Sequence, residues 1–188
     1  MSAVYVALVH HPVRDRAGDT ITTAVTNLDV HDLARSARTY DVDGYFVVVP
    51  LEVQRQLVQR ILDHWREGAG ARRVPERSEA LRICEPLASL EDAREAVVAR
   101  EGRAPLVVAT GARPPAGVEP TGYAEARARM AEEPSLVLFG TGHGLARSVV
   151  DAADLVLAPI RPGASYNHLS VRAAAAITLD RLFGDERA

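Results

Sequence analysis

The sequence predicts a single α/β domain, covering residues 1–188, that is built around a parallel sheet. Short apolar runs typical of strands alternate along the chain with amphipathic segments typical of helices, which is the order of an α/β fold. The runs are apolar at nearly every position, as expected for strands buried on both faces of a parallel sheet. With 188 residues, 47% of them hydrophobic, the chain is long enough to bury one substantial core.

Five apolar runs are the expected strands. In chain order they are AVYVALV (3–9), GYFVVVP (44–50), APLVVAT (104–110), SLVLFG (135–140) and DLVLAPI (154–160). The loop RPPAGVEPTG (113–122) follows the third run and gathers proline and glycine. Ligands of open α/β sheets sit at the carboxyl ends of strands, so the loops after these runs are the expected place for a site.

The first expected helix follows Thr26. Thr26 and Asp29 have the spacing of a capping box, and an apolar face follows at Leu33, Ala34, Ala37 and Tyr40. Asp29 and Asp32 precede Arg35 and Arg38 by one to two turns, so the spacing allows ion pairs within the helix. A solvated charged face is the favoured interpretation of most of these side chains.

A second helix is expected from Leu51 to Glu67. Its apolar stripe is predicted at one-turn intervals, at Val53, Leu57, Ile61 and Trp65. Gly68 is the expected cap at its end.

Composition excludes several classes of protein. The formal net charge is -3 and the pI about 6.1, so the chain is no broadly cationic nucleic-acid binder, although a local basic patch is compatible with these values. Cys84 is the single cysteine, which excludes an internal disulfide, and we expect it in the core of a protein from a reducing compartment. No leader pattern and no run of roughly 18 apolar residues is found, so a cytoplasmic protein without a membrane span is expected.

A glycine-rich segment, GTGHGL (140–145), follows the fourth apolar run directly. Glycines allow backbone amides to approach a ligand closely. The spacing differs from a dinucleotide-binding fingerprint, and the Gly-Lys-Ser/Thr ending of a phosphate-binding P-loop is missing. Taken alone, this segment is equally compatible with a tight turn from strand to helix.

The last helix is expected within SYNHLSVRAAAAITLDRL (165–182). Asn167 and Ser170 are polar residues of the kind that begin helices. The run from Ala173 to Ala176 carries almost no side-chain bulk, so another helix or backbone can pack closely there.

These segments together resemble the SPOUT class of RNA methyltransferases. GTGHGL after a strand, then API, then HLSVRAAAAI are similar to the two carboxy-terminal motifs of that class, and TNLDVHDLARSARTYDVDGYFVV (26–48) is similar to its first motif. The similarity extends from Val4 to Phe183. It is greatest to a compact stand-alone branch that also occurs fused to tRNA guanine-N1 methyltransferase domains.

The resemblance implies a parallel sheet with a carboxy-terminal trefoil knot, an exception to the rule that chains do not knot. It further implies a homodimer that uses S-adenosylmethionine, needs no metal and acts on structured RNA, with tRNA favoured. By the same resemblance, the cofactor is expected to contact Ala109, Thr110, Gly111, Gly140, Gly142, Gly144, Ile160, Leu169 and Ser170.

The expected catalytic residues are Arg35, Asp29, Asn167 and Ser170. Arg35 matches the arginine that ribose-methylating members place at the acceptor, where it would orient a phosphate or polarise the hydroxyl, since arginine is a poor base. Ser170 and Asp29 each stand where the class has asparagine, and Arg172 stands where it has serine. Ribose 2'-O methylation is favoured. Methylation of a base nitrogen such as guanine N1 is the alternative, with Asp29 or Asp32 as proton acceptor.

Substrate contacts are expected from Arg38, Arg172, Tyr166 and His168. Tyr166 would stack on an RNA base or pack at the subunit interface, and His168 and Asn167 would cap the helix or reach the acceptor. Arg14 and Arg16 would join Arg35, Arg38 and Arg172 in a basic RNA-binding patch if all converge on one face, and His10 and His11 would face the cleft. Two other functions are alternatives: a knotted module that binds cofactor or RNA without turnover, and a nicotinamide-dependent oxidoreductase, which the glycine spacing disfavours.

Overall fold

The computed structural model describes residues 2–163 and 165–184, and its centre is a parallel sheet. The six strands of this sheet are β1 (Val4–Val9), β4 (Gly44–Val48), β5 (Cys84–Leu87), β6 (Leu106–Ala109), β7 (Ser135–Gly140) and β8 (Leu155–Val156). Their spatial order is β5-β4-β1-β7-β6-β8, and every neighbouring pair is parallel. The predicted α/β class is therefore confirmed.

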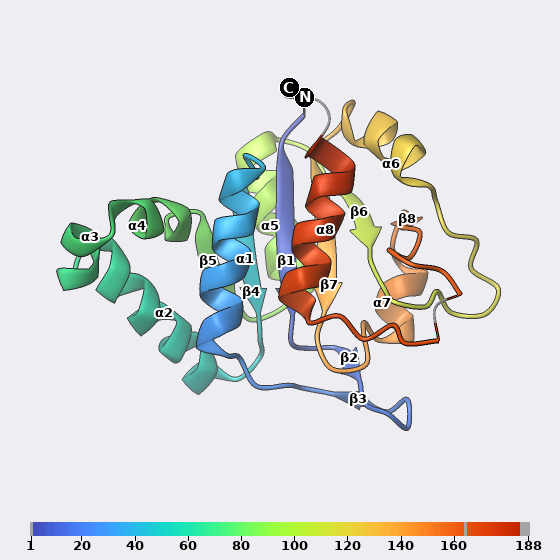
Figure 1. The fold of residues 1–188 in the computed structure, drawn as a ribbon, viewed down its shortest axis with the longest axis horizontal. Coiled ribbons are helices and arrows are strands. Elements are labelled where there is room, and N and C mark those ends of the chain that lie inside the picture. Colours follow the sequence, from blue (N-terminus) through green and yellow to red (C-terminus); the bar gives the residue numbers. More distant parts are fainter. Residues whose placement is uncertain (1, 164, 185–188) are drawn as a thin grey trace.

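Helices cover both faces of the sheet (Figure 1). The helices of the described chain are α1 (Asn27–Thr39), α2 (Glu52–Arg66), α3 (Ala69–Arg73), α4 (Pro75–Leu81), α5 (Leu90–Glu101), α6 (Tyr123–Met130), α7 (Arg147–Asp151) and α8 (Val171–Phe183). Buried side chains of α1, α2, α6 and α8 belong to one core cluster, whereas those of α5 and α7 belong to a second cluster on the opposite face. The result is three layers.

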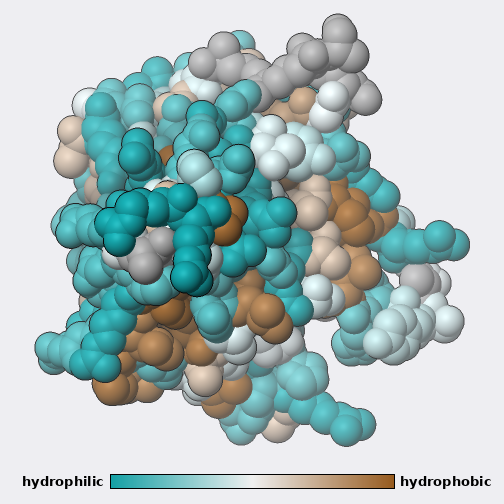
Figure 2. Space-filling model, turned by 60° about the vertical axis from the view of Figure 1, so that its left-hand side comes forward, coloured by the Kyte–Doolittle hydropathy of each residue, from teal (hydrophilic) through white to brown (hydrophobic). Residues whose placement is uncertain are grey.

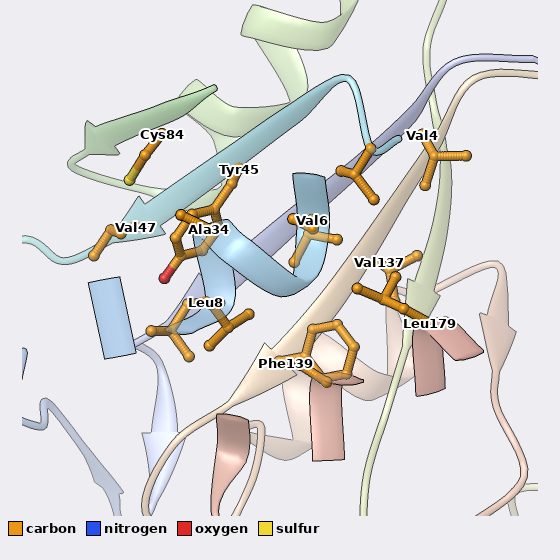
Figure 3. Close-up of a cluster of buried hydrophobic side chains, with 14 of the residues drawn as sticks. Val4, Val6, Leu8, Ala34, Tyr45, Val47, Cys84, Val137, Phe139 and Leu179 are labelled. Carbon is orange, nitrogen blue, oxygen red and sulfur yellow. The ribbon is translucent and has the colours of Figure 1, made fainter. Parts of the chain in front are cut away.

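Side chains of the central strand β1 alternate between these two clusters. Val4, Val6 and Leu8 face α1 and α8, as Figure 3 shows together with Val137 of β7, while their sequence neighbours face α5. Successive residues of a strand point to opposite faces, so a strand covered on both sides is apolar throughout. This explains why the runs in the sequence showed no alternation.

All five predicted strands form, and the sixth strand of the parallel sheet was missed, as were the two short strands of a separate pair. β5 has the sequence CEPL and lies at the edge of the sheet, where a glutamate and a proline are tolerated. Its first residue, Cys84, is buried as expected, and burial raises the pKa of its thiol to about 12. The thiol is therefore protonated near neutral pH and is a core group.

Helix α1 begins as predicted, but its charged side chains pair differently. The Thr26 hydroxyl accepts a hydrogen bond from the Asp29 backbone N–H at 3.2 Å and donates to the Asp29 carboxylate at 2.6 Å. Among the described residues, the possible Asp–Arg pairs within the helix do not form. Arg38 instead pairs with Asp41, three residues later, and with Glu79 of α4, which tertiary packing brings within reach.

The apolar stripe predicted for α2 is also wrong in its first half. Val53 is 71% exposed and Leu57 46% exposed, whereas Val58 and Leu62 are fully buried. The start of α2 lies beyond the edge of the sheet, and Figure 2 shows apolar residues at the surface on this side of the molecule. Gly68 follows the helix but has a φ of -82° and serves as the N-cap of α3.

Candidate functional site

A pocket of about 890 Å³ lies at the carboxyl ends of the central strands. The order of the strands reverses here: the chain proceeds from β1 to β4 and β5 on one side, then fills the other side with β6, β7 and β8. Ligands of open α/β sheets bind at such switch points, and this volume is in the range of cofactor sites. The walls come from the loops after β1, β6 and β7, from β8 and from the start of α8.

The glycine loop, residues 140–145, forms one wall of the pocket and is held by a small arm. The arm consists of β2 (Val13–Arg14), β3 (Thr20–Ile21) and the turn between them, and it lies at the carboxyl side of the sheet (Figure 1). The Arg14 N–H donates to the Gly144 carbonyl and the His143 N–H to the Arg14 carbonyl, both at 2.9 Å. The arm thus extends the glycine loop as a short antiparallel pair.

The shape of the glycine loop requires residues without a side chain at two positions. Gly142 has a φ of +60°, and a Cβ there would lie 2.9 Å from the Arg14 carbonyl oxygen. A Cβ on Gly140 would lie 2.5 Å from the backbone nitrogen of Leu145. The missing side chains therefore allow the loop to fold tightly beside the pocket.

The opposite wall of the pocket is formed by two loops that are bonded to each other. Thr110, after β6, donates its hydroxyl to the Leu138 carbonyl of β7 at 2.8 Å. Asn167 donates its side-chain amide to the Ala112 carbonyl at 2.7 Å, so the segment before α8 is joined to the loop after β6. Asn167 does not cap α8.

Ser170 is the N-cap of α8. Its hydroxyl accepts a hydrogen bond from the Ala173 N–H at 3.2 Å. Of the two polar residues expected to begin this helix, Asn167 and Ser170, Ser170 is therefore the one that caps it. Ala174 lines the pocket and Ala175 is fully buried. Arg181, at the other end of the helix, donates to the Ile160 carbonyl at 2.7 Å and so fixes the segment that leaves β8.

A carboxylate cluster joins α1 to α8 at the edge of the pocket. Asp29 is 6% exposed and lines the pocket, and its carboxylate accepts from Arg172 at 2.8 Å in addition to the Thr26 hydroxyl. Arg172 also lies 3.4 Å from Asp32. Both carboxylates named as candidate bases are therefore ion-paired with the same arginine.

Arg35 lies on the exposed side of α1, outside the set of pocket-lining residues. Among the described residues it has no side-chain hydrogen bond or ion pair. Arg38, one turn later, is occupied by Asp41 and Glu79. Of these two arginines, Arg35 is the one whose guanidinium is available to a further molecule.

The five arginines of the expected basic patch do not form one surface of free charges. Arg172 and Arg38 are paired with carboxylates. Arg14 lines the pocket and donates to the His143 carbonyl, whereas Arg16 lines it from the exposed turn of the arm.

The histidines and the tyrosine predicted near the acceptor are placed differently from one another. Tyr166 is 78% exposed and its ring lies 5.5 Å from that of His168, which lines the pocket. His11 is partly exposed, and its Nδ1 contacts the hydroxyl of Thr22, the residue after β3. His10 is fully buried, so the expectation that it faces the cleft is wrong.

His10 instead begins a chain of hydrogen bonds behind the pocket wall. Its Nδ1 lies 3.0 Å from the Thr23 hydroxyl, which lies 2.5 Å from the Thr141 hydroxyl, which donates to the Val9 carbonyl at 3.1 Å. Desolvation by burial lowers the pKa of His10 to about 4, so the ring is neutral near pH 7. The sequence carries no local signal for this chain, because its members come from three separate segments.

Most of the predicted site residues come together at the pocket. Those that line it are Asp29, Thr110, Gly111, Gly140, Gly142, Gly144, Ile160, Asn167, His168, Leu169 and Ser170. Those that do not are Ala109, which is buried in β6, and Arg35, Arg38, Tyr166 and Arg172. Within the described residues, no helix has the length and apolarity needed to cross a membrane.

Comparison with known proteins identifies both a family model and close relatives. The model of a family described as SAM-dependent RNA methyltransferase matches residues 3–184. Two proteins named tRNA (guanine-N(1)-)-methyltransferase, from Nitratidesulfovibrio vulgaris and Oleidesulfovibrio alaskensis, are 46% and 43% identical over 182 residues, 97% of this chain. The chain spans 42% of the length of each, so the name describes a protein more than twice as long as the matched part.

Solved structures with the same fold are more distant in sequence. One described as giving structural insights into the 2-OH methylation of C/U34 on tRNA has a TM-score of 0.58, 19% identity, and coverage of 97% of this chain and 95% of that one. The SpoU methyltransferase AviRb from Streptomyces viridochromogenes, in complex with AdoMet, has a TM-score of 0.55 at 16% identity, covering 97% and 57%. Such matches support the SPOUT fold; the trefoil knot stays a prediction.

Proposed function

Because this chain belongs to the family of SAM-dependent RNA methyltransferases, we propose that it transfers the methyl group of S-adenosylmethionine to the ribose 2'-hydroxyl of a tRNA nucleotide. The observation that carries the proposal is the pocket at the switch point of the sheet, walled by a glycine loop that follows β7. The remaining arguments concern the cofactor, the acceptor atom and the number of subunits.

The residues of the pocket fit S-adenosylmethionine. The glycine loop and the loop after β6 offer backbone groups to an adenine edge, and Leu157 and Leu169 offer apolar contacts to its faces. The Arg14 carbonyl oxygen lies 2.9 Å from the position that a Cβ on Gly142 would take, so glycine lets this loop fold tightly along the wall of the pocket. When bound, S-adenosylmethionine supplies a reactive methyl group on a sulfonium, and the protein's contribution is alignment of the acceptor and removal of its proton.

The pairing of the two candidate bases favours the ribose as acceptor. Methylation of either acceptor releases a proton. At guanine N1 a free carboxylate would accept it, whereas a 2'-hydroxyl polarised by Arg35 would pass it to water. Asp29 and Asp32 are the carboxylates considered for this step, but both are already paired with Arg172. Arg35 is exposed and free of such partners among the described residues, so it is available to orient a phosphate or polarise a hydroxyl.

We further propose that the protein is a homodimer and that Arg35 acts at the pocket of the partner subunit. Arg35 does not line the pocket of its own chain, so it reaches the methyl group only if a second molecule brings the two together. On α8, Ala173 and Ala176 are partly exposed next to α1, and their small side chains allow close approach of a second helix. A symmetric dimer is the commonest solution for such a chain.

The dimer is tested by light scattering coupled to gel filtration. The expected molar mass is about twice the 20.3 kDa of the chain, at micromolar concentration and in the presence of S-adenosylmethionine. A mass equal to one chain under these conditions would contradict the dimer and would leave Arg35 without a pocket to serve.

The reaction is tested with methyl-labelled S-adenosylmethionine and total tRNA from a strain that lacks the gene. After digestion, mass spectrometry identifies the labelled nucleoside. A 2'-O-methyl nucleoside is the expected product. Label on guanine N1 would overturn the choice of ribose and would make Asp29 or Asp32 the group that accepts the proton. Tight cofactor binding without any labelled nucleoside would favour the non-catalytic binding module.

A further inference from the structure

The hydrogen-bond chain behind the pocket wall has one possible direction. The Val9 carbonyl can only accept, so the Thr141 hydroxyl donates to it and its single proton is used. The bond of 2.5 Å between the two threonines must then be donated by Thr23. With the Thr23 proton used as well, the Nδ1 of His10 must carry the proton that it shares with Thr23 at 3.0 Å.

This direction fixes the tautomer of His10. The neutral ring carries one proton, and the chain places that proton on Nδ1, so Nε2 is unprotonated. The Nε2 atom is buried and has no hydrogen-bond partner among the described residues. Burial of a ring nitrogen without a hydrogen-bond partner costs free energy of folding. This unsatisfied nitrogen lies directly behind the wall of the pocket.

The two threonines connect the chain to the cofactor pocket. Thr23 and Thr141 both line the pocket, and Thr141 is the second residue of the glycine loop. Thr23 also donates its backbone N–H to the His10 carbonyl at 2.9 Å, so the segment after the arm is fixed to the end of β1. Among the described residues, the His10 side chain is thus linked to the glycine loop by hydrogen bonds through Thr23.

We propose that His10 is a positioning residue of the cofactor pocket: its Nδ1–H orients the Thr23 hydroxyl, which holds Thr141 and thereby the glycine loop in the shape that binds S-adenosylmethionine. The proposal rests on the proposed function, because it concerns the same pocket. The proposal assigns a role to a buried hydrogen-bond donor, the Nδ1–H of His10, that lies outside the glycine loop. The hydrogen-bond chain requires an N–H or O–H donor at this position, and another side chain with a donor at the same place would serve as well as histidine.

Substitutions at His10 distinguish its role as a hydrogen-bond donor from a role in packing alone. H10N places an amide N–H near the position of Nδ1 and keeps the donor. H10L fills much of the same volume without a donor, and T23V removes the next member of the chain. We expect H10N to bind S-adenosylmethionine within about threefold of the wild type, and H10L and T23V about tenfold more weakly. H64L, on the exposed side of α2, is the control and should bind normally.

The measurements are calorimetric titration with S-adenosylmethionine, thermal unfolding of each variant, and histidine ¹⁵N spectra of the wild type. The double variant H10L/T23V should be about tenfold weaker in binding, not a hundredfold, because the two residues act through one chain. The ¹⁵N spectrum should contain a buried histidine protonated at Nδ1. Equal affinity of H10L and H10N, in variants that remain folded, or an Nε2-protonated His10, would overturn the proposal.

The result also separates this proposal from the proposed function. A wild-type protein that does not bind S-adenosylmethionine would contradict the function itself. A wild type that binds, with H10L and T23V equally tight, would contradict the positioning of the loop alone. If H10L fails to fold, T23V still tests the chain, because Thr23 is only partly buried.

Discussion

Replacing Gly140 by alanine is expected to weaken S-adenosylmethionine binding at least about 30-fold, equivalent to about 2 kcal/mol. The new Cβ would lie 2.5 Å from the Leu145 nitrogen and 2.9 Å from the Gly144 carbonyl carbon. Both are backbone atoms, so no side chain can rotate away and the loop must open. Calorimetric titration of the purified variant measures the loss.

Gly122 offers a matched control for this substitution. It precedes α6, does not line the pocket, and a Cβ there would have no heavy atom within 4 Å. G122A should therefore bind S-adenosylmethionine as the wild type does. Wild-type affinity in a folded G140A protein would show that the cofactor does not depend on the shape of this loop.

Replacing Arg35 by alanine is expected to lower the rate of methyl transfer about 10- to 150-fold while leaving cofactor affinity within about twofold of the wild type. One charge-assisted hydrogen bond contributes about 1.5 to 3 kcal/mol, which sets this range. Affinity is preserved because the proposed partner of the Arg35 guanidinium is the RNA acceptor and not the cofactor. Single-turnover rates with saturating tRNA, together with calorimetry, measure the two quantities separately.

An exposed arginine on another helix is the control for Arg35. The side chain of Arg60 on α2 has no hydrogen bond or ion pair with other described residues. R60A should therefore transfer methyl groups at the wild-type rate. A normal rate in R35A would contradict the assignment of Arg35 to the acceptor. An equal loss in R60A would instead point to a general effect of positive charge on RNA affinity.

Mixing the two defective variants distinguishes action within one chain from action between chains. A heterodimer of G140A and R35A contains one intact pocket, in the R35A subunit, and one Arg35, in the G140A subunit. If Arg35 serves the partner's pocket, the mixture should regain activity that neither variant has alone. Continued inactivity after subunit exchange would contradict a shared site.

The fold class could be predicted because its signals are local. Apolar runs such as SLVLFG reflect burial of both faces of a strand, and Thr26 caps α1 through atoms three residues away. The glycine loop is visible for the same reason, since the conformation of Gly142 at φ +60° excludes most other residues. Each of these features depends on the residues of one short segment, so it can be predicted without knowing the rest of the fold.

The wrong predictions concern interactions between elements that are distant in sequence. Packing of α8 against α1 pairs Arg172 with Asp29, 143 residues earlier, and no local pattern indicates this pair. Periodicity identified α2 as amphipathic but placed its stripe at Val53 and Leu57, because the sequence does not show which part of the helix extends beyond the sheet.

The sequence by itself determined the α/β class, five of the six strands of the parallel sheet, the glycine loop and the polar start of the last helix. Tertiary structure alone decided which of the polar residues meet. His10, Thr23 and Thr141 lie up to 131 residues apart, and only the pairing of β1 with β7 brings them into one hydrogen-bond chain. The physical reason is that hydrogen bonds and ion pairs act over a few ångströms, whereas sequence patterns report burial along a single element.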